Sequence, residues 1–320
     1  MIYGNSKPII VSGGDGFIGK NLVKKILSLE IPVIVIDNHV TSFPVEIDSP
    51  LFTRVIEDVS ELNIDTIPKT SGVIHLASVA APSDYMMDPL LALKPNSLGT
   101  RKMIEIAERD CVRILFASTS EVYGHLTENA VAHGRIKEDD TALITLLSKR
   151  SCYSSSKRFG EELILNFKRS GGDGTNLRFF NVYGPGMDLK NLGYGRVIPN
   201  FFYNVNHGIP LTVYGDGNQV RSFLWINDAI EAILSVYFFE GTLPEALNIG
   251  NDEPIKIIEL ADKISKVLNK GHQLKFCVRE RDDPVWRRPC IELINKLTGW
   301  KPNVGLEEGL QIIAKEGKYV

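Results

Sequence analysis

A tyrosine and a lysine stand four residues apart in the segment RSCYSSSKRF. At helical spacing, Tyr153 and Lys157 would lie on one face of a helix. An ammonium group beside a phenol lowers the pKa of the phenol, and a lysine in this position can also hold a ribose. The pair therefore predicts a base that takes a proton from a hydroxyl group. This spacing also recurs by chance, so the prediction needs support from a second segment.

Hydroxyl and carboxylate side chains supply that support in the upstream segment STSEVYG. Thr119, Ser120 and Glu121 follow an apolar run that is typical of a buried strand. The carboxyl end of such a strand is where an open α/β sheet binds its ligand. We expect these residues to converge with Tyr153 and Lys157 on an alcohol that loses a proton while a hydride leaves its carbon.

A glycine-rich segment near the N-terminus, GGDGFIG, predicts where that hydride goes. Gly13, Gly16 and Gly19 follow one apolar run and open a helical pattern, so backbone N–H groups there can bind a pyrophosphate. By itself the triple also fits a tight turn with no ligand. Asp37 ends the next apolar run, where a carboxylate accepts hydrogen bonds from ribose hydroxyls and repels a 2′-phosphate. Together these features predict NAD, rather than NADP, as the cofactor.

Asp58 follows the third apolar run and has two interpretations. Its carboxylate could contact the adenine amino group, or it could cap a short helix over residues 60–62. The other walls of the cofactor site are expected from Phe17, Ile18, Asn38, Val59, Leu76, Ala77 and Ser78, with Tyr153 and Lys157 at its reactive end.

Alternating apolar runs and helical patterns predict the elements that position these groups. Strands are expected at 8–12, 33–36, 52–56, 72–76 and 112–117, and long helices at 17–29, 90–109 and 150–169. Runs such as VIVI suit a parallel sheet that is buried on both faces. The expected fold class is therefore α/β, with a Rossmann-like doubly wound parallel sheet.

The pattern becomes less regular after residue 172. Turn-rich segments separate helices expected at 196–207, 227–239 and 256–269. We predict an NAD-binding domain over 1–172 and a smaller α/β substrate-binding region over 173–320, some of whose segments return to the sheet. The polar stretch 124–149 is long for a connection, which favours a lid or a binding loop.

Composition excludes several classes of partner. The 320 residues carry a formal net charge of −3, so the chain lacks the basic excess expected of a protein that binds nucleic acid or an anionic membrane. No apolar run is long enough to span a bilayer, and no signal-peptide pattern opens the chain, so we expect a cytoplasmic protein. The four cysteines share no metal-binding or disulfide spacing, and no metal site is predicted.

Together, these motifs resemble the extended short-chain dehydrogenase/reductases that modify nucleotide sugars, and the resemblance covers nearly the whole chain. It is carried by GGDGFIG, VIDN, HLASVAAPSDYMMDP, NSLGT, STSEVYG, RSCYSSSKR, RFFNVYGPGM, GRVIPNF, LTVYGDGNQVRSF, ALNIGN and DDPVWRRP. Members of this group begin by oxidising a sugar hydroxyl to a ketone with bound NAD. The resemblance implies a nucleoside diphosphate sugar, UDP-linked, as substrate, and a homodimer formed through the helices at 90–109 and 150–169.

The resemblance also implies the residues that hold the sugar nucleotide. These are Pro82, Tyr85, Asn181, Arg196, Val197, Tyr214, Arg221 and Arg287. Tyr85 also fits an exposed aromatic on an amphipathic helix. Arg287 is preferred to Arg288 only because of the proline that follows.

Three reactions remain open within this group. The loop containing Tyr85 and the RSCYxxxKR and DDPxxRxP segments resemble the UDP-glucuronate decarboxylases. Ser120 and Glu121 stand where many dehydratases of the group have Asp-Glu, although the GDP-mannose dehydratases have a similar TSE. In the decarboxylase reaction Arg287 would face the substrate carboxylate, and Glu121, Arg287 or water would return a proton to C5. A 4-epimerase and a 4,6-dehydratase are the alternatives, and a non-catalytic NAD-binding homologue is a fourth possibility from another class.

Overall fold

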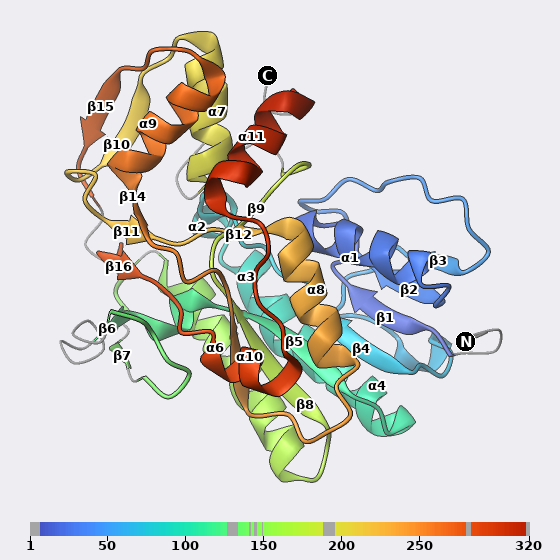
Figure 1. The fold of residues 1–320 in the computed structure, drawn as a ribbon. Helices are drawn as coiled ribbons and strands as arrows, with labels where there is room; N and C mark the ends of the chain where they lie inside the picture. Colours follow the sequence, from blue (N-terminus) through green and yellow to red (C-terminus); the bar gives the residue numbers. More distant parts are fainter. Residues whose placement is uncertain are drawn as a thin grey trace.

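A seven-stranded parallel sheet forms the centre of the molecule, as the computed structural model shows for residues 7–126, 134–140, 142–143, 146–148, 150–187, 196–279 and 283–317 (Figure 1). Its strand order is β13-β8-β5-β4-β1-β2-β3. The strands are β1 (Ile9–Ser12), β2 (Val33–Ile36), β3 (Phe52–Val55), β4 (Gly72–His75), β5 (Ile114–Thr119), β8 (Gly174–Phe179) and β13 (Ala246–Ile249). The order reverses between β1 and β4, which confirms the doubly wound fold.

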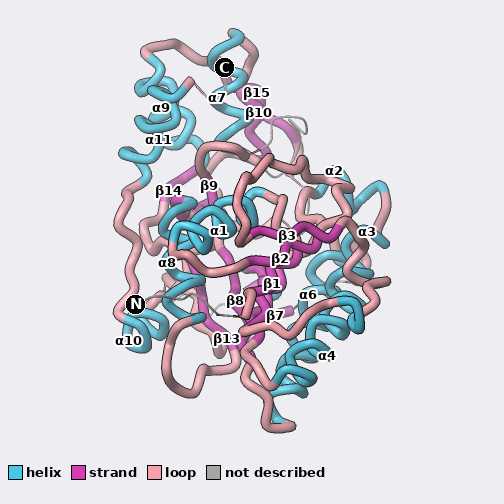
Figure 2. The backbone as a smooth tube through the Cα atoms, turned by 90° about the vertical axis from the view of Figure 1, so that its right-hand side faces the viewer, coloured by secondary structure: helices cyan, strands magenta, loops and turns pink. Residues whose placement is uncertain are grey.

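Helices cover both faces of this sheet (Figure 2). On one face lie α1 (Phe17–Ser28) and α8 (Ile226–Tyr237), whose apolar side chains share a core with alternate residues of β1 and β2. On the other face lie α4 (Thr100–Asp110) and α6 (Ser151–Arg169), which pack on the intervening residues of the same strands. Burial on both faces explains why these strands are uniformly apolar in sequence.

The long helix predicted at 90–109 is interrupted. The chain forms α3 (Leu90–Lys94), then a π-helical turn over Pro95–Gly99, and only then α4. Proline has no N–H to donate to the preceding turn, so the regular ladder cannot continue through Pro95. The turn places Asn96 against α6, where its amide donates to Ser156 Oγ at 3.1 Å and to Ser78 Oγ at 3.1 Å.

A smaller region packs at the carboxyl end of the sheet (Figure 1). It contains α7 (Val197–His207), α9 (Ile257–Leu268), α11 (Leu306–Glu316) and the parallel pair β10 (Leu211–Tyr214) and β15 (Leu274–Cys277). Short strands β11 (Val220–Arg221), β14 (Ile255–Lys256) and β16 (Trp286–Arg287) form a small sheet, while β9 (Val182–Tyr183) pairs with β12 (Leu224–Trp225). Although β8 and β13 follow residue 172, they belong to the central sheet; the boundary there stays a prediction.

The remaining elements are short. They are α2 (Pro82–Met87), α10 (Glu292–Thr298), the 3-10 turns at Ile64–Thr66 and Ser120–Tyr123, and the strand pair β6 (His125–Leu126) and β7 (Ala142–Leu143). Much of the predicted lid at 124–149 lies outside the described residues. Within the described part of the chain, every helix is too short or too polar to cross a membrane.

Candidate functional site

The glycine-rich loop connects β1 to α1 at the carboxyl edge of the sheet. Gly13 has a φ of 71°, a left-handed conformation that glycine adopts without strain. A Cβ at Gly19 would collide with the carbonyl oxygen of Gly13, so the helix can pack this closely on the loop only with glycine there. Because α1 begins directly after the loop, the positive end of its dipole faces the adjoining cavity.

Asp37 lies beside this loop, and its carboxylate already accepts three hydrogen bonds from the protein. Its Oδ1 accepts from His39 N at 2.9 Å and Ser42 Oγ at 2.7 Å, and its Oδ2 accepts from Asp15 N at 3.1 Å. A second lone pair on Oδ2 is directed to no other donor among the described residues. The carboxylate is therefore fixed in place and can still accept a hydrogen bond from a ribose hydroxyl.

An ionic cluster behind Asp37 was not apparent in the sequence. Asp15 is buried and accepts two hydrogen bonds from Arg54, both at 2.8 Å, and His39 Nε2 lies 2.8 Å from the same carboxylate. Arg54 comes from β3, which pairs with β2 in parallel register. The sequence gives no sign of this contact, since only the pairing of the two strands brings Arg54 to the loop.

Asp58 closes a turn in the structure rather than capping a helix over 60–62, and its contact with the adenine amino group stays a prediction. Its Oδ1 accepts from the backbone N–H and the hydroxyl of Ser60 at 2.8 and 2.7 Å, which closes a local turn, and its Oδ2 accepts from Asn38 Nδ2 at 2.9 Å. Burial alone would raise the pKa of Asp58, but the hydrogen bonds from Ser60 and Asn38 outweigh it and lower the pKa. The residue stays ionised and holds Asn38 at the cavity wall.

All predicted cofactor residues line one cavity of about 580 Å³. They are Gly13, Gly16, Phe17, Ile18, Gly19, Asp37, Asn38, Asp58, Val59, Leu76, Ala77, Ser78, Tyr153 and Lys157. A glycine cradle at one part and a fixed carboxylate at another fit the pyrophosphate and adenosine ribose of NAD. Their individual roles stay predictions.

The reactive centre brings together the end of β5 and the first turn of α6. The side chains of Thr119 and Tyr153 share a hydrogen bond, and both line the cofactor cavity and the neighbouring cavity. Thr119 Oγ1 also accepts from Glu121 N at 3.3 Å. The two hydroxyls therefore stand at the junction of the two cavities, where a substrate hydroxyl could reach both.

The electrostatics of Tyr153 differ from the prediction. Burial is the main cause that raises the pKa of Tyr153, and neighbouring Tyr85 adds to it, while the Thr119 hydrogen bond and the charge of Arg150 lower it. Lys157 Nζ donates to Ala117 O at 2.6 Å and lies 5.9 Å from the centre of the Tyr153 ring. Arg150 thus favours the phenolate, an influence not expected from the sequence, and the predicted effect of Lys157 on Tyr153 stays a prediction.

Lys157 is itself perturbed by its surroundings. It is 2% exposed, and burial lowers its pKa to about 7, a fall that the charge of Glu161 limits. Glu161 accepts hydrogen bonds from Ser118 Oγ and from Arg178 at 2.8 and 2.9 Å. This buried network links β5, α6 and β8 beneath the lysine and fixes its position, but it leaves Lys157 incompletely charged at neutral pH.

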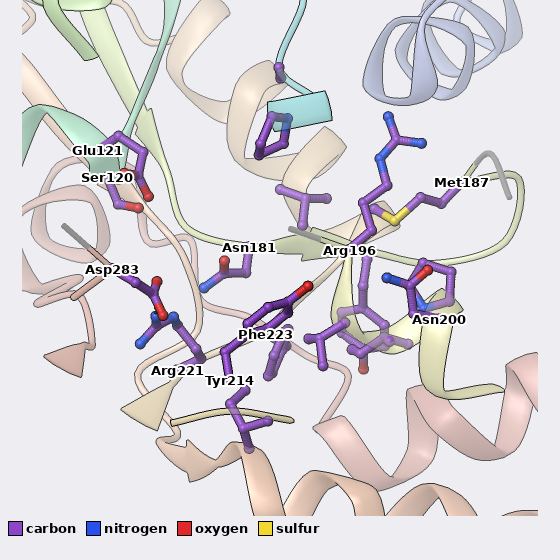
Figure 3. A pocket seen from close by; sticks show the side chains of 18 of the residues that line it. Ser120, Glu121, Asn181, Met187, Arg196, Asn200, Tyr214, Arg221, Phe223 and Asp283 are labelled. Carbon is purple, nitrogen blue, oxygen red and sulfur yellow. Dashed lines mark hydrogen bonds and ion pairs between the residues drawn. The ribbon is translucent and has the colours of Figure 1, made fainter. Parts of the chain in front are cut away.

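The second cavity, of about 340 Å³, lies between the reactive centre and the smaller region. Of the predicted substrate residues, it is lined by Pro82, Tyr85, Asn181, Arg196, Val197, Tyr214 and Arg221, together with Thr119, Ser120, Glu121 and Tyr153. Figure 3 shows Ser120 and Glu121 at one side of the pocket and Arg196 at the other. Asn181 is held with a φ of 27° while its amide donates to Ser222 O at 2.9 Å.

Four charged side chains gather at the Glu121 side of this cavity. Arg150 lies 3.2 Å from Glu121 Oε2 and 3.7 Å from Asp283 Oδ1, and Arg221 donates to the same Asp283 oxygen at 2.8 Å. Figure 3 shows Arg221 and Asp283 side by side. Arg150 and Asp283 were not among the predicted site residues, although both occur in the motifs RSCYxxxKR and DDPxxRxP.

Tyr85 connects this charge cluster to the reactive centre. It is 1% exposed, and its ring stacks on that of Tyr153 with centroids 5.1 Å apart and an interplanar angle of 4°. Burial raises the pKa of Tyr85 to about 12, although Arg150 opposes this through its charge and a hydrogen bond to the phenol. The alternative interpretation, an exposed aromatic, is therefore excluded by its burial.

Comparisons with known proteins agree with this geometry. Residues 9–250 match the model of the NAD dependent epimerase/dehydratase family. The chain belongs to the NAD-dependent epimerase/dehydratase family. It is 34% identical over 313 residues to UDP-glucuronic acid decarboxylase 4 of Arabidopsis thaliana, covering 96% of this chain and 68% of that relative. It is also 34% identical over 312 residues to UDP-glucuronic acid decarboxylase 1 of Danio rerio, covering 95% and 71%.

Solved structures of this family share the fold. A UDP-N-acetylglucosamine 4-epimerase from Methanobrevibacter ruminantium superposes with a TM-score of 0.86 at 26% identity, covering 97% of this chain and 98% of that one. MoeE5 in complex with UDP-glucuronic acid and NAD superposes with a TM-score of 0.83 at 26% identity, covering 97% and 99%. The resemblance inferred from the motifs is confirmed, and the protein is an NAD-dependent enzyme of this family.

In this epimerase/dehydratase family member, Arg287 is buried close to the charges of Glu121, Arg150, Arg221 and Asp283, and its predicted contact with a substrate carboxylate stays a prediction. It does not line the substrate cavity; it is 2% exposed and donates to Gly124 O at 2.7 Å. Burial lowers the pKa of Arg287 to about 10, and its Nε and Nη1 have no hydrogen-bond partner among the described residues. Arg288 Nε donates to Asp252 O at 2.6 Å, so it does not replace Arg287.

Proposed function

We propose that the protein oxidises C4 of a UDP-linked uronic acid, releases the C5 carboxylate as carbon dioxide, and reduces C4 again. The observation that carries this is the pairing of Arg150, Glu121 and Asp283 beside Tyr153, at the substrate end of the junction between the cavities. A guanidinium such as that of Arg150, beside the carbon that is oxidised, can form an ion pair with an acidic sugar but not with a neutral one. The near full-length similarity to UDP-glucuronic acid decarboxylases supports the same reaction.

Tyr153 and Thr119 handle the proton and the negative charge. Tyr153 takes the proton of the C4 hydroxyl, with Thr119 hydrogen-bonded to the same oxygen. NAD held in the cofactor cavity, between the glycine-rich loop and Lys157, would supply the hydride acceptor for C4 and the hydride donor for the final reduction. When the bond to the carboxylate breaks, negative charge develops on the C4 oxygen, and the two hydroxyl donors stabilise it there.

A proton must then reach C5, and we propose that Glu121, a carboxylate that lines the cavity, relays it there from water. It lies two residues beyond Thr119 and lines the substrate cavity beside Ser120. Water or Arg287 remain the other proposed donors, although the buried position of Arg287 favours a role in holding Gly124. The nucleotide part of the substrate is assigned to Asn181, Arg196, Val197, Tyr214 and Arg221.

The test is mass spectrometry of the protein incubated with UDP-glucuronic acid, UDP-glucose, GDP-mannose and dTDP-glucose, each with and without added NAD+. Loss of the mass of carbon dioxide from the uronate is the expected result. Loss of the mass of water from a neutral hexose nucleotide would instead establish a 4,6-dehydratase. An unchanged mass with a changed NMR spectrum would establish an epimerase, the activity named for one of the similar solved structures.

We further propose a cytoplasmic homodimer. Leu98 on the π-helical turn and Phe159 on α6 are 58% and 54% exposed, and these two elements pack side by side. Burial of such side chains against a second copy would remove them from water. Sedimentation analysis of the protein and of the double variant Leu98→Asp/Phe159→Asp tests this, with a shift to monomer expected for the variant.

A further inference from the structure

Among the residues that the structure describes, three arginines line the substrate cavity: Arg150, Arg196 and Arg221. They differ in what they contact. Arg196 also lines the cofactor cavity, and Arg221 is bound to Asp283 and to the carbonyl oxygen of Val220 at 2.9 Å. Of these three arginines, only Arg150 is among the main charges that shift the pKa of Tyr153, and it lowers that pKa. Arg150 is therefore the arginine of this cavity wall whose charge acts on the Tyr153 hydroxyl.

Substrate chemistry fixes where a carboxylate must lie. In a hexuronic acid the carboxylate is attached to C5, the carbon next to C4. Since Tyr153 and Thr119 bind the C4 oxygen, the carboxylate must lie close to these two side chains, where the junction opens into the substrate cavity. The cavity wall at that place carries Tyr85, stacked on Tyr153, and Arg150, which is hydrogen-bonded to the Tyr85 phenol.

We infer that Arg150 binds the C5 carboxylate and makes the site select a uronic acid over a neutral hexose. This rests on the proposed function and assigns its specificity to a residue other than the predicted Arg287. A guanidinium offers five donors in a planar fork, so a substrate carboxylate can take over N–H groups of Arg150 that otherwise face Glu121.

The neighbouring acids adjust how strongly Arg150 holds that carboxylate. Glu121 at 3.2 Å and Asp283 at 3.7 Å share its positive charge. An unshared ion pair would stabilise the substrate carboxylate and so oppose the loss of carbon dioxide, because the charge moves away from it in the transition state. Because Arg150 shares its charge with Glu121 and Asp283, it can recognise the substrate carboxylate without binding it tightly. The negative charge of Glu121 also favours the loss of carbon dioxide from that carboxylate.

The experiment compares equilibrium binding of UDP-glucuronic acid and UDP-glucose by calorimetry. All proteins carry Tyr153→Phe, which stops turnover and keeps the ring that stacks on Tyr85, and all are loaded with NAD+. The variants are Arg150→Gln and Arg150→Lys. The matched control is Arg169→Gln, an exposed arginine on the same helix that is paired with Glu162 at 3.0 Å.

Arg150→Gln is expected to weaken UDP-glucuronic acid binding by about 10- to 100-fold and to leave UDP-glucose binding within about twofold. Arg150→Lys should retain part of the preference, and Arg169→Gln all of it. Equal losses for both ligands, or no loss for either, would overturn the role of Arg150 while leaving the proposed function in place. A different pair of results would overturn the proposed function, and the role of Arg150 with it. In that case the Tyr153→Phe protein would not prefer UDP-glucuronic acid, and the protein with Tyr153 would release no carbon dioxide from it.

Discussion

The two cavities of this enzyme are built in different ways. In the cofactor cavity, the two predicted carboxylates are held in part by neighbours in sequence: Asp37 by His39 and Ser42, and Asp58 by Ser60. In the substrate cavity, charges are paired across long separations, as in the contacts of Asp283 with Arg150 and Arg221. Backbone geometry therefore governs the first cavity, and the balance of distant charges governs the second. The predictions below test that contrast.

Tyr153 lies in both cavities, and its loss should have the largest effect. Tyr153→Phe removes the hydroxyl that bonds Thr119 but keeps the ring stacked on Tyr85. Turnover should fall by about 10²- to 10⁴-fold, the usual contribution of a general acid or base. The measurement is the initial rate of product formation, with UDP affinity as the control. A rate within tenfold of the parent would assign the proton transfer to another group.

A backbone change should damage the cofactor cavity without any change of charge. In Gly19→Ala the new methyl would press on the main chain of Gly13 and Gly14, which cannot move aside as a flexible side chain could. The free energy of unfolding should fall by about 3 kcal/mol or more, and bound NAD should be lost. Chemical denaturation and the absorbance of extracted cofactor measure the two effects.

Gly271→Ala is the matched control, since nothing lies within 4 Å of its added methyl and its backbone is not left-handed. Its unfolding free energy should stay within about 0.5 kcal/mol of the parent. Equal stability of the two variants would show that the glycine loop tolerates side chains, and would remove the backbone argument for the cofactor cavity.

The contrast also explains what the sequence could predict. Glycine spacing and strand ends are local features, so the residues predicted from GGDGFIG, Asp37 and their neighbours all line one cavity. Arg150 and Asp283 meet only because α6 and the segment before β16 fold together. Arg287 is paired in register with Arg221 across β16 and β11, but of the two only Arg221 lines the cavity, a difference that the motif alone could not predict.

Lys157 gives the cofactor cavity a pH dependence. Its pKa is about 7 in the folded protein and near its ordinary 10.5 when unfolded, so between these values the unfolded state binds the extra proton. Stability should therefore rise with pH from about 7 towards 9, by up to about 1.4 kcal/mol per pH unit. His75, whose pKa burial lowers to about 3, acts below this window.

The test is the midpoint of thermal unfolding at pH 7, 8 and 9 for the parent and for Lys157→Met. The rise should be present in the parent and absent in the variant. Lys168→Met, on the same helix and bonded to Leu243 O at 2.6 Å, is the control and should keep the parent slope. A slope that persists in Lys157→Met would mean that another buried group titrates there.

Asp283 should give the smallest effect, and one of opposite sign. In the substrate cavity it occupies Arg221, which is assigned to the nucleotide, and it takes part of the charge of Arg150. Asp283→Asn should therefore tighten UDP binding, by no more than about fivefold, because the amide removes the charge that competes for Arg221 but can still accept its hydrogen bond. Calorimetry with UDP measures this, and Asp173→Asn, which breaks a pair with Arg113 in another part of the molecule, should leave UDP affinity unchanged. Weaker binding by Asp283→Asn would show that the carboxylate orients Arg221 for the phosphates rather than competing with them, and the charges of this cavity would then cooperate instead of opposing one another.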